Sequence, residues 1–180
     1  MSECSDCELQ RAPEGHFYYL AFGSNLLSER LKLANPSATY VANVKLCAHA
    51  LGFVYHSKKW HGAVATIYSC DGTEICGTLW QMNLDDLESL DRQEGKKYRR
   101  KVVVAACLNT GVKYECYTYE VKDATNYNEL PSPHYKTVIV CGAQEHKLPE
   151  SYIEKLKQMP DNGYSGRVEY DLDVLKDLNK

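Results

Sequence analysis

The sequence contains no apolar run near the roughly 18 to 20 residues that a membrane-spanning helix needs, so we expect no membrane partner. Its first residues lack the basic stretch and following apolar stretch of a secretory signal, which predicts a cytoplasmic protein. The formal net charge of −3 provides no broad positive field for a phosphate backbone, and we expect no nucleic-acid partner. These absences favour a small, neutral or zwitterionic ligand.

Motifs of three common enzyme classes are also missing. There is no Gly-rich phosphate loop, no Gly-x-Ser-x-Gly elbow and no His-Glu-x-x-His pair, so nothing supports a nucleotide enzyme, a serine hydrolase or a zinc protease. Cys4 and Cys7 have the spacing of half a zinc site, but no second pair of ligands follows, and we predict no metal. The eight cysteines are scattered, several of them in apolar runs, which predicts free thiols in a reducing compartment.

The length and composition indicate one folded domain. The chain has 180 residues, of which 44% are hydrophobic and 25% are charged, as in ordinary globular proteins. Residues 1–15 are polar, lack periodicity and end in Ala-Pro-Glu-Gly, so we interpret them as a flexible N-terminal lead-in. The single domain is therefore expected to cover residues 16–180.

Short runs rich in β-branched and aromatic residues predict most of the domain to be sheet. The expected strands cover residues 17–22, 39–41 together with 44–46, 51–55, 63–68, 74–80, 98–108 and 114–121. Asp71-Gly72 is the best hairpin signal, and it is predicted to join residues 64–68 to residues 75–80. Together these runs predict a sheet of about six or seven strands.

Helices are predicted between and after the strands. They are expected from Ser28 to residue 33, from Asn83 to Gln93, from Pro133 to about Gln144, and from Pro149 to about Met159. Ser28, Asn83 and Ser132 are the expected N-caps, and the tail from Ser165 is expected to pack along the surface. Strands with inserted helices and no regular βαβ alternation predict an α+β fold, a compact mixed β-barrel with flanking α-helices.

Three segments are candidates for the functional site. Residues 19–25 end a strand in Gly-Ser-Asn, which exposes backbone N–H groups that can hold a carboxylate or an oxyanion, although a plain strand-to-helix turn has the same sequence. Glu94 precedes Gly95 at a helix end, where it is either solvated or held inward with a raised pKa suited to acid/base catalysis. Tyr135 lies in the first turn of a helix, as a ligand contact or as a packing residue.

Taken in order, several motifs resemble the gamma-glutamylcyclotransferase family from about Phe17 to about Gly166. The motifs are AFGSNLLSER at 21–30, NPSA at 35–38, WHGAVATI at 60–67, SLDRQEG at 89–95, PSPHYK at 131–136 and GAQE at 142–145. The resemblance implies a compact mixed β-barrel without metal or organic cofactor. It also implies a cytosolic homodimer and a carbon-nitrogen lyase that converts gamma-glutamyl amino acids into 5-oxoproline and the free amino acid.

The same resemblance assigns roles to particular residues. Glu94 matches the catalytic glutamate of the family, and it would move a proton from the substrate's α-amine to the departing amine. The residues expected to contact the substrate are Tyr19, Leu20, Ala21, Phe22, Gly23, Ser24 and Tyr135. Because the substrate's own α-amine can close a five-membered ring on its γ-carbonyl, one acid/base residue is enough for the reaction.

Two departures from the family pattern leave alternatives open. Position 22 is Phe where the family commonly has Tyr, which removes a hydroxyl from the loop. The stretch between Phe53 and Trp60 is short for the branch that acts on gamma-glutamyl amino acids, and residues 95–100 resemble the wider superfamily. The alternatives are a cyclotransferase specific for gamma-glutamylamines or glutathione, and a catalytically inactive binding module on the same fold.

Overall fold

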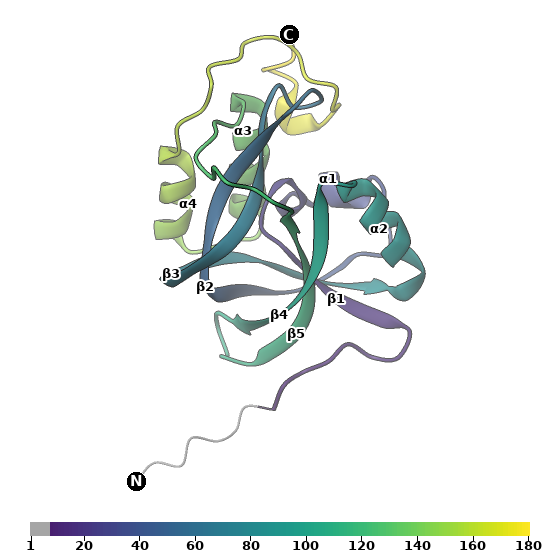
Figure 1. The fold of residues 1–180 in the computed structure, drawn as a ribbon. Helices are drawn as coiled ribbons and strands as arrows, with labels where there is room; N and C mark the ends of the chain where they lie inside the picture. Colours follow the sequence, from purple (N-terminus) through teal and green to yellow (C-terminus); the bar gives the residue numbers. More distant parts are fainter. Residues whose placement is uncertain (1–7) are drawn as a thin grey trace.

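Five strands form a closed barrel in the order β1-β3-β2-β4-β5 in the computed structural model, which describes residues 8–180 (Figure 1). Cys4 and Cys7 lie outside the described residues. The strands are β1 (His16–Ala21), β2 (Thr39–Ser57), β3 (Gly62–Asn83), β4 (Tyr98–Cys107) and β5 (Lys113–Val121). The predicted α+β barrel is confirmed, with five strands in place of the expected six or seven.

Two long strands account for the lower strand count, because β2 takes in the runs predicted at 39–46 and 51–55, and β3 takes in those at 63–68 and 74–80. The hairpin predicted at Asp71-Gly72 is therefore wrong. Strands β2 and β3 pair antiparallel along most of their length, and the turn between them lies at residues 58–61. At Asp71-Gly72 the register shifts, because β3 has extra residues opposite Ala48. Gly72 has a φ of 77°, a conformation that an irregular bulge uses as readily as a tight turn does.

The barrel closes through β1. This strand pairs antiparallel with β3, where Tyr19 lies opposite Trp80, and parallel with β5, where Tyr19 lies opposite Tyr117. Before β1, the backbone N–H of Gln10 donates to Lys113 O at 2.8 Å, so part of the segment before residue 16 extends the edge of β5. Because β1 lies between β3 and β5, its last residue and the loop after it lie at one mouth of the barrel.

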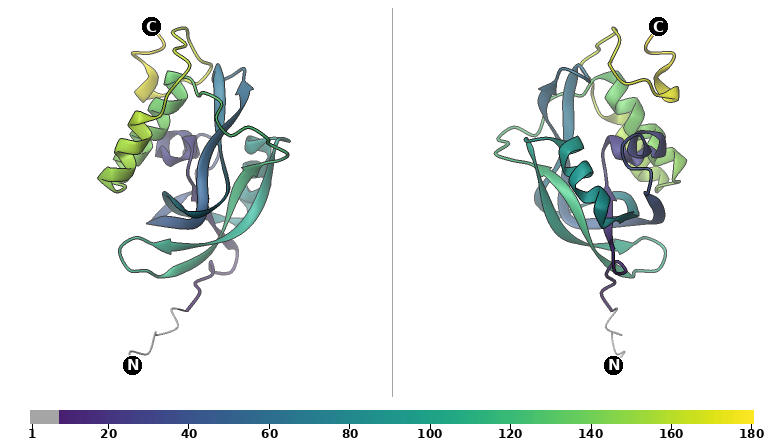
Figure 2. Two further views of the ribbon diagram at one scale, coloured as in Figure 1. Left: turned by 60° about the vertical axis from the view of Figure 1, so that its left-hand side comes forward. Right: turned by 90° about the vertical axis from the view of Figure 1, so that its right-hand side faces the viewer.

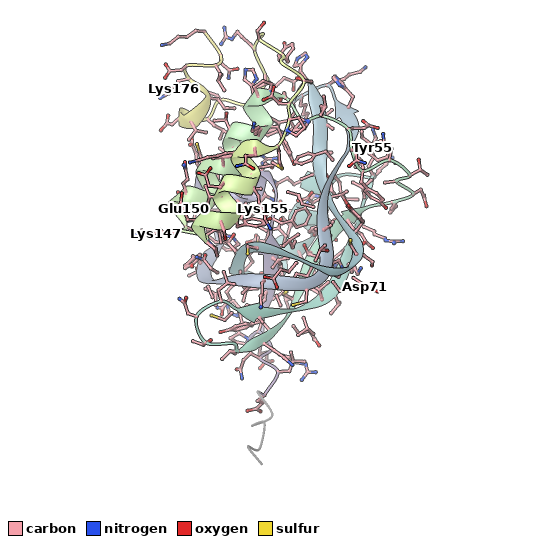
Figure 3. The ribbon with its side chains drawn as sticks, turned by 90° about the vertical axis from the view of Figure 1, so that its left-hand side faces the viewer. Tyr55, Asp71, Lys147, Glu150, Lys155 and Lys176 are labelled. Carbon is pink, nitrogen blue, oxygen red and sulfur yellow. The ribbon has the colours of Figure 1, made fainter. Side chains whose placement is uncertain are left out.

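The helices lie on two sides of the barrel (Figures 1 and 2). They are α1 (Ser28–Lys32), α2 (Leu87–Glu94), α3 (Pro133–Glu145) and α4 (Glu150–Gln158), with 3-10 turns η1 (Ser24–Leu26), η2 (Leu84–Asp86) and η3 (Asp173–Leu175). Figure 3 shows the α4 side with Glu150 and Lys155 at the surface. No helix of residues 8–180 combines the length and apolar character needed to cross a membrane.

One of the three predicted N-caps is confirmed. The Ser132 hydroxyl accepts a hydrogen bond from Tyr135 N at 3.2 Å, with Pro133 at the first position of α3. Asn83 forms no such bond. Ser28 does not cap α1, because that helix follows directly from η1, and the Ser28 N–H instead donates to the Glu145 carboxylate at 3.0 Å. A contact between distant segments thus replaces the expected local cap.

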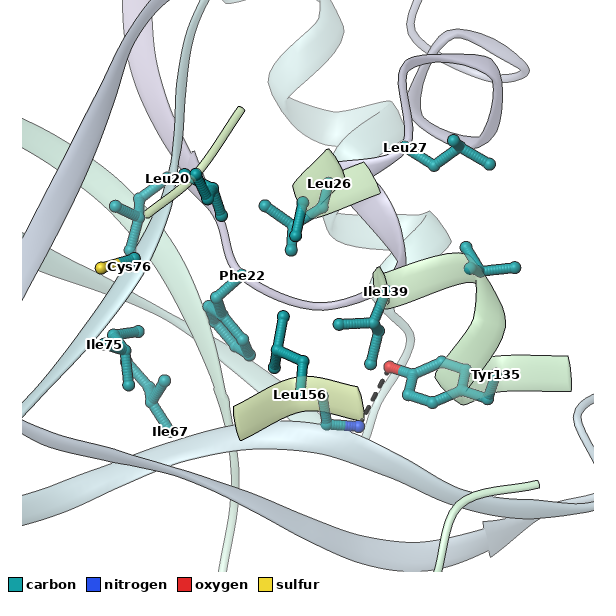
Figure 4. Close-up of a cluster of buried hydrophobic side chains, with 14 of the residues drawn as sticks. Leu20, Phe22, Leu26, Leu27, Ile67, Ile75, Cys76, Tyr135, Ile139 and Leu156 are labelled. Carbon is teal, nitrogen blue, oxygen red and sulfur yellow. Dashed lines mark hydrogen bonds between the residues drawn. The ribbon is translucent and has the colours of Figure 1, made fainter. Parts of the chain in front are cut away.

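Two buried clusters hold the elements together. The larger lies between the barrel and the α3–α4 pair, and Figure 4 shows part of it, including Leu20, Phe22 and Ile139. The smaller packs Trp80 of β3 against Leu90 of α2 and further residues of β1, β5 and α1. The tail was expected to lie along the surface, but it buries Val168, Leu172 and Leu175 in the larger cluster. This burial brings the tail close to the barrel mouth.

Candidate active site

Two adjoining cavities occupy the mouth of the barrel. The outer cavity has a volume of about 470 Å³, and it is lined by the β2–β3 turn, the turn between α2 and β4, and residues of η1 and α3. The inner cavity has a volume of about 30 Å³ and is lined by β1 and the loop that follows it. Both cavities are bordered by Ser24, Asn25, Glu94, Tyr98 and Tyr135. The outer volume is typical of small-ligand sites, while the inner one holds a single small group.

Helix α2 places Glu94 between the two cavities. Leu90 is fully buried and fixes one side of the helix against the barrel. Gly95 ends the helix with a φ of 81°, and its N–H donates to Asp91 O at 3.1 Å. A residue with a side chain is strained at such a φ, so glycine is what allows the chain to turn away directly after Glu94. The carboxylate is therefore left half-buried at the cavity wall.

The surroundings of Glu94 favour its neutral form more than water does. Burial raises the pKa of Glu94 from its ordinary 4.5 to about 7, while Arg30 lowers the pKa and Asp91 raises it by smaller amounts. The Asn25 amide donates to Glu94 Oε1 at 3.3 Å and to the Tyr19 hydroxyl at 3.0 Å. The carboxyl group is thus oriented by a buried side chain, and it can accept and release a proton near neutral pH.

Tyrosine hydroxyls surround this carboxyl group. Tyr135 accepts a hydrogen bond from Ala65 N at 3.0 Å, the dashed contact in Figure 4, and Tyr98 donates to Ala65 O at 2.7 Å. Tyr119 donates to Asp91 at 2.5 Å. Burial raises the pKa of Tyr135 to about 12, so its hydroxyl stays protonated at neutral pH. Because the Tyr135 oxygen accepts from Ala65, its own proton can be donated to a ligand in the cavity.

Most of the predicted site residues meet at these cavities. Glu94, Ser24 and Tyr135 border both, and Tyr19, Phe22 and Gly23 line the inner one. Leu20 and Ala21 do not join them, because both are fully buried and line neither cavity. Their positions in β1 place them in the barrel wall, where they pair with Leu79 and Thr78 of β3.

The loop after β1 presents free backbone donors to the inner cavity. Among the described residues, the N–H groups of Gly23 and Ser24 donate to no protein acceptor. A Cβ atom at Gly23 would lie 3.2 Å from Ala65 Cβ and 3.3 Å from the Tyr135 hydroxyl, so the loop backbone lies close to this cavity wall. Such a pair of N–H groups can bind a carboxylate or a developing oxyanion.

The sequence interpretation missed Arg30 and Tyr170, which belong to the wall of the outer cavity. Arg30 is only 8% exposed, and its guanidinium carbon lies 4.7 Å from the centre of the Tyr170 ring. Trp60 stacks on the same ring with 4.2 Å between the ring centres. Arg30 lies within the 21–30 motif, which was a usable signal, whereas nothing in the sequence near Tyr170 indicates a cavity.

The described residues offer no evident metal centre. Between residues 8 and 180, no three side chains of His, Cys, Asp or Glu come together in a group that could hold an ion. The mouth of the barrel brings together one carboxyl group with a pKa of about 7, two backbone N–H groups and several tyrosine hydroxyls.

A half-buried carboxyl group with a raised pKa, at the wall of two adjoining cavities, is the kind of site that a small-molecule enzyme uses. A family described as AIG2-like matches residues 74–156. Gamma-glutamylcyclotransferase from Mus musculus is 41% identical over 96% of this chain and 95% of its own. The Homo sapiens protein of that name is also 41% identical, with the same coverage. A solved structure titled gamma-glutamyl cyclotransferase has a TM-score of 0.82 at 38% identity, covering 91% of this chain and 98% of its own. The chain belongs to the gamma-glutamylcyclotransferase family.

Proposed function

We propose that this chain converts gamma-glutamyl amino acids into 5-oxoproline and the free amino acid, with Glu94 as general acid and base. The observation that carries the proposal is the Glu94 carboxyl group, with its pKa of about 7, at the wall between the two cavities. A group with this pKa is poised to take and return a proton near neutral pH. The names of the relatives support the same reaction.

The reaction needs one bond to form and one to break. The substrate's α-amine attacks its own γ-carbonyl carbon, which forms the C–N bond of a five-membered ring. Glu94 takes a proton from the α-ammonium, which frees the amine to attack. The ring nitrogen loses a second proton as the original amide C–N bond breaks, and the departing nitrogen, which receives both protons, leaves as an ammonium group. No water, metal or other reactant enters the balance, since the substrate supplies its own nucleophile.

The remaining residues bind and orient the substrate. The free N–H groups of Gly23 and Ser24 hold a polar oxygen of the glutamyl part at the inner cavity. Tyr135, whose hydroxyl lies beside Gly23, donates its hydroxyl proton to the substrate. The inner cavity of about 30 Å³ admits only a small group, so the rest of the substrate lies in the outer cavity.

The proposal extends to location and assembly. The six cysteines within residues 8–180 are all free, which supports a reducing, cytoplasmic setting. The family resemblance supports a homodimer. Size-exclusion chromatography with light scattering measures the assembly directly, and a mass near 20.4 kDa would overturn the dimer.

The test of the reaction is the release of 5-oxoproline. The purified protein is incubated in parallel with gamma-glutamyl-alanine, gamma-glutamyl-ε-lysine and glutathione, and the product is measured by mass spectrometry. We expect release from gamma-glutamyl-alanine above the other two. Preference for another substrate would change the branch of the family, and no release from any of them by folded protein would overturn the proposal.

The pH dependence tests the role of Glu94 separately. The ionised carboxylate is the base, and its pKa is about 7, so kcat/KM should fall by about tenfold per pH unit below that value. The measurement is the initial rate with gamma-glutamyl-alanine across the acid range, at a concentration well below KM. A fall centred near 4.5, the ordinary value for a glutamate, would contradict the proposed environment of Glu94.

A further inference from the structure

Four lysines stand around the opening of the outer cavity. Lys58 and Lys59 come from the turn between β2 and β3, and Lys96 and Lys97 come from the turn between α2 and β4. All four are exposed, and all four line the same cavity as Glu94. We call these four residues the lysine rim. Nothing in the proposed proton transfer uses them.

The charge of the lysine rim is not balanced by the protein. Within the described part of the chain, none of the four forms an ion pair, and Glu94 is the one acidic side chain lining the cavity. Lysines elsewhere on the barrel do have partners, such as Lys101 with Glu120 at 3.4 Å. A chain with a net charge of −3 therefore gathers unpaired positive charge at the opening of the cavity that Glu94 lines.

One rim lysine is fixed against the cavity wall. Lys97 Nζ lies 4.5 Å from the centre of the Tyr55 ring, within the range of a cation–π contact. Tyr55 has a φ of 54° at a register shift of β2, and its hydroxyl donates to Lys122 O at 3.1 Å. An irregular strand thus places the aromatic ring where it meets the ammonium group. The contact joins the turn between α2 and β4 to the end of β2, three residues before Lys58.

The position of the rim relative to Glu94 indicates which part of the substrate it meets. Under the proposed function, the glutamyl part lies against Gly23, Ser24 and Glu94 at the inner end. The leaving group on the other side of the scissile amide then extends through the outer cavity toward the rim. A leaving amino acid carries an α-carboxylate there, and an acidic one carries a second carboxylate.

We propose that the lysine rim selects the leaving group by negative charge, with acidic amino acids preferred over neutral ones and amines without a carboxylate disfavoured. This inference rests on the proposed function and names the substrate class of the same site. Unpaired ammonium groups attract a carboxylate as the substrate enters, and they repel a cationic leaving group. Substrates of similar shape but different charge should therefore differ in kcat/KM. Tyr55 acts as a positioning residue for Lys97.

Two substrate pairs of matched shape test the proposal. Gamma-glutamyl-glutamate is compared with gamma-glutamyl-glutamine, and gamma-glutamyl-alanine with gamma-glutamyl-ethylamide, which lacks only the carboxylate. We expect kcat/KM to be about tenfold higher for the more negative member of each pair at low ionic strength, mainly through KM, with a smaller ratio in added salt. Replacing Lys58, Lys59, Lys96 and Lys97 by glutamine should bring both ratios close to one.

The matched control replaces two lysines away from the cavity. Lys147 and Lys155 are exposed, line no part of the outer cavity, and lie away from Tyr55 in Figure 3. Changing both to glutamine should leave the two ratios as in the wild type. Equal kcat/KM values within each pair would overturn the selection by charge and leave the cyclotransferase reaction standing. Absence of 5-oxoproline from all four substrates would instead overturn the proposed function itself.

Discussion

Replacing Glu94 by glutamine is expected to lower kcat/KM for gamma-glutamyl-alanine by about 10²- to 10⁴-fold in a protein that remains folded. Glutamine has the shape of glutamate, and its oxygen can still accept the hydrogen bond from Asn25. What it cannot do is take a proton from the α-ammonium of the substrate. The measurement is 5-oxoproline release at saturating and limiting substrate, which separates kcat from KM.

The same substitution has a predictable effect on stability. The pKa of Glu94 is raised in the folded protein to about 7 from its ordinary 4.5. Between these values the folded state binds more protons than the unfolded state, so the wild type loses stability as pH rises through this window. Glu94→Gln has no proton to lose. We therefore expect it to be at least as resistant to denaturant as the wild type at pH 8, measured by urea unfolding.

The matched control for Glu94→Gln is Glu88→Gln. Glu88 lies in the first turn of the same helix, is exposed, and borders neither cavity. Its substitution removes the same charge from the chain and should leave kcat/KM within about twofold of the wild type, as expected for a surface charge. Near-normal turnover by folded Glu94→Gln would remove Glu94 from the mechanism, whatever Glu88→Gln does.

Strand β1 and the start of α3 could be predicted from the sequence, because both are determined by residues that are neighbours in the chain. The apolar run at residues 17–22 became β1, and the Ser132 cap with Pro133 began α3 as expected, since both depend on neighbours in the chain. Asp71-Gly72 misled because the same backbone conformation serves a hairpin and a bulge. Pairing between β2 and β3 decides between the two, and that pairing is set by residues far away in the sequence.

The candidate site, like the fold, depends partly on local sequence and partly on contacts between distant residues. The helix end at Gly95 made Glu94 a candidate, but its raised pKa depends on burial at the cavity wall beside Asn25, which no spacing shows. Arg30 and Tyr170 meet across 140 positions of sequence. Phe22 is 7% exposed, and it both lines the inner cavity of about 30 Å³ and packs in the larger buried cluster. Only the folded barrel shows that this space exists.

Replacing Gly142 by alanine is expected to destabilise the protein, although alanine is the better helix former by about 1 kcal/mol. Gly142 lies in α3, packed directly against the loop after β1. A Cβ atom there would lie 2.5 Å from Leu27 N and 2.6 Å from Leu26 C, which are backbone atoms that cannot rotate away. Overpacking typically costs about 1 to 3 kcal/mol, and the three contacts below 3.0 Å at Gly142 place this substitution at the upper end, about 3 kcal/mol.

The expected result for Gly142→Ala is a net loss of about 2 kcal/mol, which lowers Tm by about 4 to 8 °C for a chain of this length. The same displacement moves η1, which carries Ser24 and Asn25, so activity should fall in the fraction that remains folded. Gln144→Ala, at an exposed position of α3, is the control and should leave Tm within about 2 °C. A raised Tm in Gly142→Ala would show that helix propensity outweighs this contact, and that the loop holding Asn25 against Glu94 does not depend on α3.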